Sequence, residues 1–456
     1  METKRRQPEP GQSKLLSPFG ETREAWKPIS KFVPSVSLRR RVLSFIQRRL
    51  ADNPPPIRLI FWDGEFFDLA PAPIVTITIR TRAVLRLLLT GRMDRLGDAY
   101  VAGDLVVEGS IEEVLRCGVS LADRIGRSST LSRLGRLAAL TRPRHSRRAD
   151  AAAISHHYDV SNDFYKLWLD RNMIYSCAYF RTGREDIDTA QEQKLEHICR
   201  KLRLNPGERL LDVGCGWGGF LRFAALHYGV SGVGVTLSAE QHRFAKEQIA
   251  AEHLADRLEI RLEDYRDIPG TACFDKIASV GMYEHVGLAN QPLYFQTIAR
   301  LLKPGGILLN HGIVVTDPQA RAKGPPGGEF IDRHVFPGGE LPHVSSLLYE
   351  IARSGLEPVD MEDLRPHYAK TLLHWSRRLE AHASEACQFA GPQCFRIWRM
   401  FLPGMAYAFD HGWLSVVQVV AYKPHPTSMA RRPWTRAYQY DEADNSVLAS
   451  DYPGNE

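Results

Sequence analysis

Several features that are common in other protein classes are missing from this sequence. No window holds the roughly 18 consecutive apolar residues that a transmembrane helix needs, so we expect no membrane span. The first residues, METKRRQPEP, are charged and no apolar stretch follows them, so we expect no secretory signal. The seven cysteines are odd in number and scattered without CxxC spacing. This argues against a disulfide framework or a zinc site, and favours a reduced, cytosolic compartment.

What is present is typical of a globular chain. Of the 456 residues, 44% are hydrophobic and 25% are charged, which argues against a disordered, collagen-like or coiled-coil protein. The length predicts two to three domains, or one large domain with a smaller one attached. The sequence contains no internal repeats.

Positive charge is concentrated in the N-terminal third. Residues 1–150 carry 27 Lys and Arg against 16 Asp and Glu, a net charge of +11, whereas the remainder has a net charge of −5. Between Arg124 and Arg148 there are eight arginines and no acidic residue, and leucines recur among them. The segment is either a surface helix packed on its own domain or a basic amphipathic segment that binds a polyanion, such as nucleic acid or an anionic membrane surface.

The hydrophobic pattern changes at about residue 151. Before it, IRLIFWDGEFFDL predicts two short strands around the Asp63-Gly64 turn, APIVTITIRT predicts a third, and AVLRLLLTG predicts a helix ended by Gly91. After it, five apolar runs alternate with helical patterns, which predicts βαβ units in a doubly wound, Rossmann-like α/β sheet. FRIWRMFLPGMAYAFDHGWLSVVQVVAYKP predicts a helix and a closing strand. The predicted parts are a mobile arm over 1–35, a small α+β module over 36–120, a basic amphipathic segment and linker over 121–150, a catalytic domain over 151–425 and a polar tail over 426–456.

A glycine-rich loop follows the first strand of the catalytic domain, in LLDVGCGWGGF. Its glycines are Gly214, Gly216, Gly218 and Gly219. Such a loop lets the backbone approach a ligand at a helix N-terminus, but this spacing is not that of a dinucleotide site. The second strand also ends in Val235-Thr236-Leu237, with no acidic residue for a ribose. The pattern instead resembles S-adenosylmethionine-dependent methyltransferases, in which Asp212 would orient the methionine part of the cofactor.

Polar side chains stand where the predicted strands end. They are Asp212, Thr236, Asp264, Glu284 and His311. Ligands of open α/β sheets bind along the carboxyl ends of the strands, so these side chains predict a site at that edge.

Longer motifs make the resemblance specific. They are ISHHYDVSNDFYKLWLDRNMIYSCAYF, VGCGWGG, GVTLSAEQ, SVGMYEHVG, NHGI, FIDRHVFPGGELP and HYAKTLLHW. Over roughly residues 90–425, including LGDAYVAGD, the sequence resembles the cyclopropane-fatty-acyl-phospholipid synthase family, which includes mycolic acid cyclopropane synthases. The resemblance implies a class I methyltransferase fold preceded by a small α+β module.

The resemblance also implies which residues bind S-adenosylmethionine. Tyr175 and Ser176 match positions that close over the cofactor, and Asp264 and Tyr265 match a pair near adenine where relatives often carry Trp-Glu. The implied set is Tyr175, Ser176, Asp212, Gly214, Cys215, Gly216, Thr236, Leu237, Gln241, Asp264 and Tyr265.

A second set is implied to hold a bicarbonate ion that acts as the general base. It comprises Cys177, Glu284, His311, Ile313 through its backbone, and Tyr368. A base is required because attack of a cis double bond on the sulfonium methyl leaves a carbocation, which must lose a proton before a ring closes. General-base assistance typically contributes about 10²–10⁴-fold. Taken singly, Cys177, His311 and Tyr368 could instead be buried packing residues.

We therefore expect an enzyme that adds a methylene across the cis double bond of an unsaturated phospholipid acyl chain. Simple C-methylation to methyl-branched chains is the alternative within this class. A non-catalytic lipid-binding protein and a nucleic-acid methyltransferase are alternatives from other classes. The basic segment has no aromatic–basic interleaving and the chain has no D/N-P-P-Y-type motif, so we expect no nucleic-acid partner. The expected location is cytoplasmic, peripherally attached to the anionic inner face of the cell membrane, and a homodimer is left open.

Overall fold

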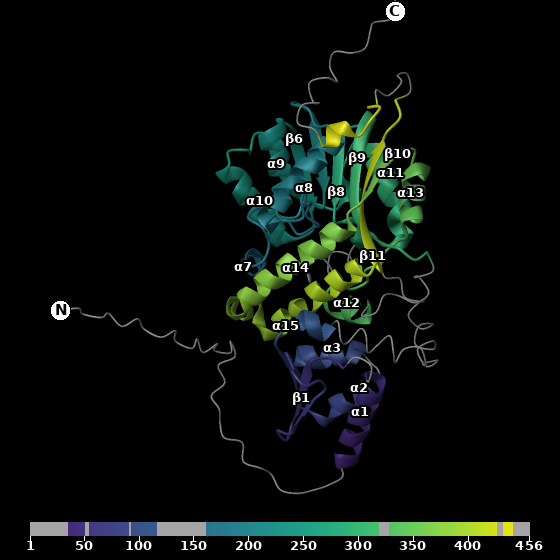
Figure 1. Cartoon of the computed structure of the whole chain (residues 1–456). Helices are drawn as coiled ribbons and strands as arrows, with labels where there is room; N and C mark the ends of the chain where they lie inside the picture. The colour runs from purple at the N-terminus through teal and green to yellow at the C-terminus, as the bar shows by residue number, and fades with distance from the viewer. Residues whose placement is uncertain are drawn as a thin grey trace, which may run out of the picture.

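The chain folds around two β-sheets (Figure 1). The computed structural model describes residues 35–50, 54–90, 93–115, 161–318, 328–425 and 432–440. The predicted arm up to residue 34 and the whole basic segment over 121–150 lie outside these ranges. Within the described part of the chain, no helix combines the length and apolarity needed to cross a membrane.

The first sheet belongs to the predicted N-terminal module. Its elements are α1 (Ser35–Leu50), β1 (Ile57–Phe61), β2 (Phe66–Asp68), β3 (Val75–Ile79), α2 (Arg82–Thr90), α3 (Met93–Ala102) and β4 (Leu105–Glu108). The strand order is β2-β1-β3-β4, with β1 and β3 parallel and the outer pairs antiparallel. The predicted Asp63-Gly64 turn joins β1 to β2, and Gly64 adopts the positive φ of 81° that favours glycine there.

The second sheet has seven strands in the order β10-β11-β9-β8-β5-β6-β7. They are β5 (Arg209–Val213), β6 (Ser231–Thr236), β7 (Leu258–Leu262), β8 (Phe274–Val280), β9 (Leu302–Val315), β10 (Glu357–Asp363) and β11 (Leu414–Tyr422). Strands β5 to β9 pair in parallel, whereas β11 is antiparallel to both of its neighbours. The chain order reverses around β5, which opens a crevice at the carboxyl edge.

The sequence predicted six of these strands and missed β10. The five apolar runs correspond to β5 through β9, and the predicted closing strand is β11. β11 is buried along its whole length, which explains its nearly continuous apolar sequence LSVVQVVAY. β10 is an edge strand with the sequence EPVDMED, and none of its residues is fully buried, so no apolar run marks it.

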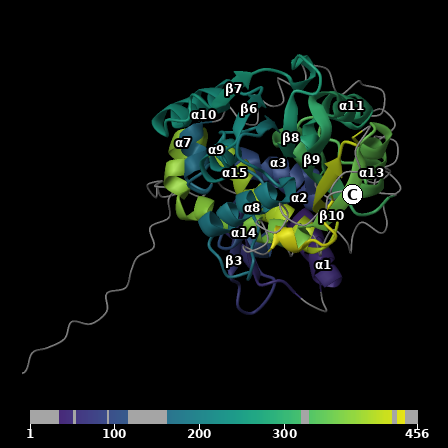
Figure 2. The same cartoon turned by 90° about the horizontal axis from the view of Figure 1, so that it is seen from above.

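Helices cover both faces of the seven-stranded sheet (Figures 1 and 2). On one face lie α8 (Ile187–Leu202), α9 (Gly219–Tyr228) and α10 (Ala239–Ala251). On the other lie α11 (Gln291–Leu301) and α13 (Val344–Arg353). Leu195 and Leu221 belong to the core under the first face, and Ile298 and Leu347 to the core under the second. The arrangement confirms the predicted doubly wound α/β fold.

Two long helices, α14 (Arg365–Ala381) and α15 (Ala383–Asp410), lie between this sheet and the N-terminal module (Figure 1). Together with α7 (Asn162–Lys166) they enclose a core rich in aromatic rings. On the other side, Arg396 Nε donates to the carbonyl of Val101 at 2.9 Å, and Arg399 Nη1 donates to that of Val107 at 2.9 Å. A Cβ at Gly97 of α3 would stand 2.8 Å from the Phe330 ring of α12 (Gly328–His334). These contacts seat the module against the catalytic unit.

Part of the segment predicted to be a polar tail is folded onto the catalytic unit. Residues 432–440 contain the short helix η7 (Ala437–Gln439), where Tyr438 and Gln439 are buried. Gln439 Nε2 donates to Asp360 Oδ2 at 3.0 Å, and Arg436 forms an ion pair with Asp360 at 2.7 Å. Hydrogen bonds and an ion pair hold residues 432–440 in place. Because no apolar run accompanies these contacts, the sequence predicted a polar tail where the structure has a packed segment.

Candidate active site

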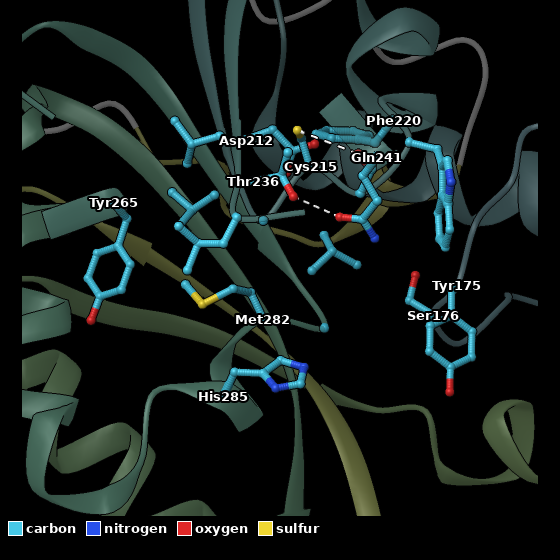
Figure 3. Close-up of a pocket in the computed structure, with 18 of the residues that line it drawn as sticks. Tyr175, Ser176, Asp212, Cys215, Phe220, Thr236, Gln241, Tyr265, Met282 and His285 are labelled. Carbon is cyan, nitrogen blue, oxygen red and sulfur yellow. Dashed lines mark hydrogen bonds between the residues drawn. The ribbon is translucent and has the colours of Figure 1, made fainter. Parts of the chain in front are cut away.

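A pocket opens at the carboxyl ends of β5, β6 and β8, where the strand order reverses (Figure 3). All eleven residues predicted to bind the cofactor line this pocket. Figure 3 shows Tyr175 and Tyr265 on opposite sides of it, with Asp212 and Thr236 along a third side. Lys194, Met282 and His285 also line it. Met282 and His285 belong to the motif SVGMYEHVG, but none of the three was assigned to a site from the sequence.

The glycine loop forms one wall of the pocket. The amides of Gly214 and Cys215 both donate to the carbonyl of Val235 at 3.0 Å, which pins the loop to β6. Gly214 has a φ of 81°, and a Cβ there would stand 2.7 Å from the Cβ of Met282. A Cβ at Gly216 would meet no atom within 4 Å. The loop therefore packs tightly at Gly214 and leaves open space at Gly216.

Two buried ionisable side chains stand in the pocket wall. Asp212 is 2% exposed, and burial raises its pKa to about 7 against the opposing charge of Lys194. Lys194 is 1% exposed, and its Nζ donates to Ser176 Oγ at 2.8 Å. Burial lowers the pKa of Lys194 to about 8, while the Asp170 carboxylate acts in the opposite direction. A cation and an acid in one wall suit a ligand that carries both charges. The sequence signal that could have identified Lys194 is its position among the buried residues of α8, where a lysine needs a polar partner.

Side-chain contacts fix the other walls. Thr236 Oγ1 donates to Gln241 Oε1 at 2.7 Å (Figure 3). Asp264 begins the short helix η3 (Tyr265–Asp267) and accepts from the Arg266 amide at 2.9 Å and from its Nη2 at 2.6 Å. Asp264 therefore lines the pocket as predicted, but its carboxylate is already paired with the Arg266 guanidinium. The Tyr265 ring lies under that guanidinium, 5.6 Å from its carbon.

Two of the residues predicted to hold the base are adjacent in sequence to residues of the pocket lining. Cys177 follows Ser176, and Glu284 stands between Met282 and His285. Glu284 Oε1 accepts from the Ile313 amide at 2.7 Å. Glu284 Oε2 is shielded from solvent and has no hydrogen-bond partner among the residues that the structure describes.

Burial raises the pKa of Glu284 to about 7, although the hydrogen bonds from its own backbone and from Ile313 oppose the shift. The Ile313 amide, which the resemblance assigns to the ion, is engaged by this carboxylate. The structure thus joins Glu284 to Ile313 and leaves one buried carboxyl oxygen available to a ligand.

Two other members of this set, Cys177 and His311, are buried and uncharged. Burial raises the pKa of the Cys177 thiol well above its usual range, so the thiol stays protonated. Burial and the charges of Lys194 and Lys201 lower the pKa of His311 to about 3, so its ring is neutral. Cys177 Sγ donates to the carbonyl of Ala178 at 3.2 Å. Tyr368 is half-buried on α14 and packs 4.6 Å from the Phe409 ring.

Comparisons with known proteins agree with this geometry. A family model described as mycolic acid cyclopropane synthetase matches residues 145–419, and one described as a domain of unknown function matches residues 48–129. The chain is 46% identical over 398 residues to a probable fatty acid methyltransferase of Pseudomonas putida, covering 86% of this chain and 100% of that protein. It is 39% identical over 267 residues to the cyclopropane-fatty-acyl-phospholipid synthase of Escherichia coli K12, covering 58% of this chain and 66% of that protein.

A solved structure supports the same assignment. Mycolic acid cyclopropane synthase CmaA1, complexed with SAH and CTAB, matches with a TM-score of 0.57 at 33% identity, covering 59% of this chain and 97% of that one. Fold, pocket and family match agree, and the chain belongs to the mycolic acid cyclopropane synthetase family of S-adenosylmethionine-dependent methyltransferases.

Proposed function

We propose that this protein transfers a one-carbon unit from S-adenosylmethionine to the cis double bond of an unsaturated phospholipid acyl chain and closes a cyclopropane ring. When bound, the cofactor supplies an electrophilic methyl group, and the ring closes after that methyl loses a proton. The observation that carries the proposal is the buried Oε2 of Glu284 beside the pocket, which has no hydrogen-bond partner among the described residues. A methyltransferase that acts on a nitrogen or an oxygen has less need of such a group, because the proton it removes is not on carbon.

Pocket residues of opposite charge suit the methionine part of the cofactor. Lys194 would hold its carboxylate and Asp212 its ammonium group, since both line the pocket and both are buried. Charge-assisted hydrogen bonds of this kind contribute about 1.5–3 kcal/mol each. Loading the pocket with an ammonium group would also favour the ionised form of Asp212.

The second cluster suits a small anionic base such as bicarbonate. The neutral His311 ring and the Tyr368 hydroxyl can each donate a hydrogen bond to an anion. The Cys177 thiol, which donates to the carbonyl of Ala178 at 3.2 Å, would have to rotate away from that carbonyl to do so. Glu284 Oε2 would accept the hydroxyl proton of the ion, which gives this buried oxygen a partner. The Ile313 amide would hold Glu284 in position through the hydrogen bond that it already donates.

An apolar surround would protect a cation formed on the acyl chain. The Tyr175 ring lies 5.3 Å from Trp375 and 5.8 Å from Trp398, in a core that also contains Trp168. Such rings exclude water, and a ring face stabilises a cation by about 0.5–2 kcal/mol. We place the acyl chain along the partly buried apolar side chains beside this core, which are Ile313, Phe336, Leu341 and Tyr368.

We also propose that the N-terminal third attaches the enzyme to the cytoplasmic, anionic face of a membrane. The net charge of +11 over residues 1–150 supports this proposal. Co-sedimentation with anionic vesicles should weaken as salt is added, because screening shortens the range of the attraction. Binding that does not respond to salt, or equal binding to neutral vesicles, would count against it.

Incubation with methyl-labelled cofactor tests the reaction. The purified full chain is mixed with unsaturated phospholipid vesicles, and in parallel with DNA and RNA, and acyl chains are analysed by mass spectrometry. We expect label only in lipid, with the mass of one methylene added per chain, in a product that survives mild hydrogenation of alkenes. No label in lipid, or label in nucleic acid, would refute the proposal.

Methyl- or methylene-branched acyl chains are the second candidate product. The similarity to a probable fatty acid methyltransferase supports it. A methylene branch is lost on mild hydrogenation and a saturated methyl branch gives a different fragmentation pattern, so the same experiment separates these products from a ring.

A further inference from the structure

A buried series of polar side chains leads from His311 away from the cofactor pocket. Gln418 Nε2 lies 3.2 Å from His311 Nδ1, and Lys201 Nζ donates to Gln418 Oε1 at 2.8 Å. Lys201 Nζ also donates to Glu362 Oε2, and His197 Nε2 lies 2.7 Å from the same oxygen. The described contacts form one connected series of five side chains.

Separate elements of the fold bring these side chains together. Gln418 is the direct cross-strand partner of His311 in the β9–β11 ladder, so both side chains project from the same face of the sheet. Lys201 comes from α8, which packs on that face, and Glu362 comes from β10. Gln418 and Lys201 are both completely buried. A lysine and a glutamine at fully buried positions are costly unless their polar atoms are paired.

The lysine fixes the orientation of the glutamine. An ammonium group donates hydrogen bonds and accepts none, so the amide oxygen of Gln418 faces Lys201 and its NH₂ group faces His311. His311 Nδ1 must therefore accept a hydrogen bond. A neutral imidazole carries a single proton, so that proton resides on Nε2.

We propose that Lys201 and Gln418 are positioning residues that hold His311 as the neutral Nε2–H tautomer, so that its ring offers a hydrogen-bond donor to the anionic base. The inference rests on the proposed function, because an Nε2–H group would bind an anion whereas the opposite tautomer would present a lone pair to it. Gln418 carries no titratable proton, so the series orients His311 and does not conduct protons.

The outer end of the series is anchored by charge and covered by the C-terminal segment. Burial would raise the pKa of Glu362, but the hydrogen bond with His197 and the charge of Lys201 outweigh it and bring the pKa to about 2. The carboxylate is therefore ionised. Burial lowers the pKa of Lys201, and the charge of Glu362 together with its hydrogen bond opposes that shift and favours the ammonium form. The Tyr440 ring lies 5.7 Å from the His197 ring, so residues 432–440 cover this end.

Gln418→Glu gives the sharpest test, because it is nearly isosteric and reverses the hydrogen bond to His311. A carboxylate would accept from Nδ1–H and still pair with Lys201. The matched control is Asn310→Asp, an equally buried amide-to-acid change on the residue that precedes His311 in β9, whose side chain meets Tyr294 on the opposite face. We expect kcat to fall about 10–100-fold in Gln418→Glu, by analogy with the loss seen when the partner that orients a metal-ligating histidine is removed. The cofactor Kd should stay within about twofold.

Nitrogen-15 NMR of histidine-labelled full-length protein reads the tautomer directly. His311 is assigned from the resonances lost in His311→Gln. We expect a protonated Nε2 and an unprotonated Nδ1 in the wild type and in Asn310→Asp, and a protonated Nδ1 in Gln418→Glu. A wild-type proton on Nδ1, or a kcat within twofold of wild type in Gln418→Glu, would overturn the inference.

Two further variants keep the test decisive if Gln418→Glu folds poorly. Lys201→Met removes the group that orients the amide, so we expect a mixture of tautomers and a lower kcat, whereas Lys201→Arg should restore both. Equal tautomer ratios in these two variants would overturn the inference. The NMR readout does not depend on turnover, so a wild-type protein that labels no lipid would refute the proposed function while the tautomer assignment is still judged separately.

Discussion

The cofactor pocket and the neighbouring residues proposed to hold the base differ in the chemistry of their side chains. We call the second group the base cluster; it comprises Cys177, Glu284, His311, Ile313 and Tyr368. The pocket combines a glycine loop at the strand ends with two buried ionisable groups, Lys194 and Asp212. The base cluster combines uncharged donors with one carboxyl group whose second oxygen has no partner in the described structure. In the proposed function, charged groups would bind the cofactor, whereas uncharged donors would receive a small anion that takes part in proton transfer.

Removing the carboxyl group of the base cluster should give the largest difference between the two regions, because turnover should fall while cofactor affinity is kept. We expect Glu284→Gln to lower turnover about 10²–10⁴-fold, the typical contribution of a general base and its partners. Cofactor affinity, measured by calorimetry, should stay near the wild-type value because Glu284 lies outside the pocket lining. Unchanged turnover would show that this cluster does not take part in the reaction.

The pH dependence of stability should identify the buried acid of the pocket. The pKa of Asp212 is raised from 3.8 to about 7, so the folded, ligand-free protein retains a proton that the unfolded chain has released. Stability should therefore fall as the pH rises from about 4 to about 7, by on the order of 2–4 kcal/mol. Asp212→Asn should remove this part of the pH dependence, measured by urea unfolding at pH 5 and pH 8. A variant with the same slope as the wild type would contradict the assignment.

Removing the buried cation should weaken cofactor binding. We expect Lys194→Met to raise the cofactor Kd about 10–100-fold, because one charge-assisted hydrogen bond is lost. The matched control is Lys276→Met, which removes another buried lysine that donates to the carbonyl of Leu202 outside the pocket. That control should lose stability and keep its affinity. Equal cofactor affinities in the two variants would show that Lys194 does not contribute to cofactor binding.

A substitution in the tightly packed glycine loop should change cofactor affinity the least among these variants. Gly214→Ala places a Cβ 2.7 Å from Met282 at a φ of 81°, so we expect the cofactor Kd to rise roughly 10-fold. Gly64→Ala is the control, since it has the same φ and an open environment in the N-terminal module. It should cost some stability and leave cofactor binding unchanged. If both variants bind the cofactor like the wild type, the loop does not need its glycine for this ligand.

The sequence predicted the strand-end residues that line the pocket, but it did not predict the side chains that other elements bring against them. Asp212, Thr236 and the glycine loop are local features of strand ends, and a parallel sheet brings such ends together at one edge. Lys194 escaped prediction because it lies on a helix, and its approach to Ser176 depends on how α8 packs. The same holds for Gln418 and Lys201, which meet His311 only through the antiparallel pairing of β11 with β9. Long-range packing determines these contacts, and no single motif encodes them.

Deuterium retention tests the central claim most directly. The full chain is given a cofactor with a fully deuterated methyl group together with unsaturated phospholipid vesicles, and the product acyl chains are analysed by mass spectrometry. If the base cluster removes a proton from the transferred methyl, each ring will keep two of the three deuterium atoms. Chains that keep all three would show that the proton leaves another carbon, and would contradict the role proposed for Glu284 and its neighbours.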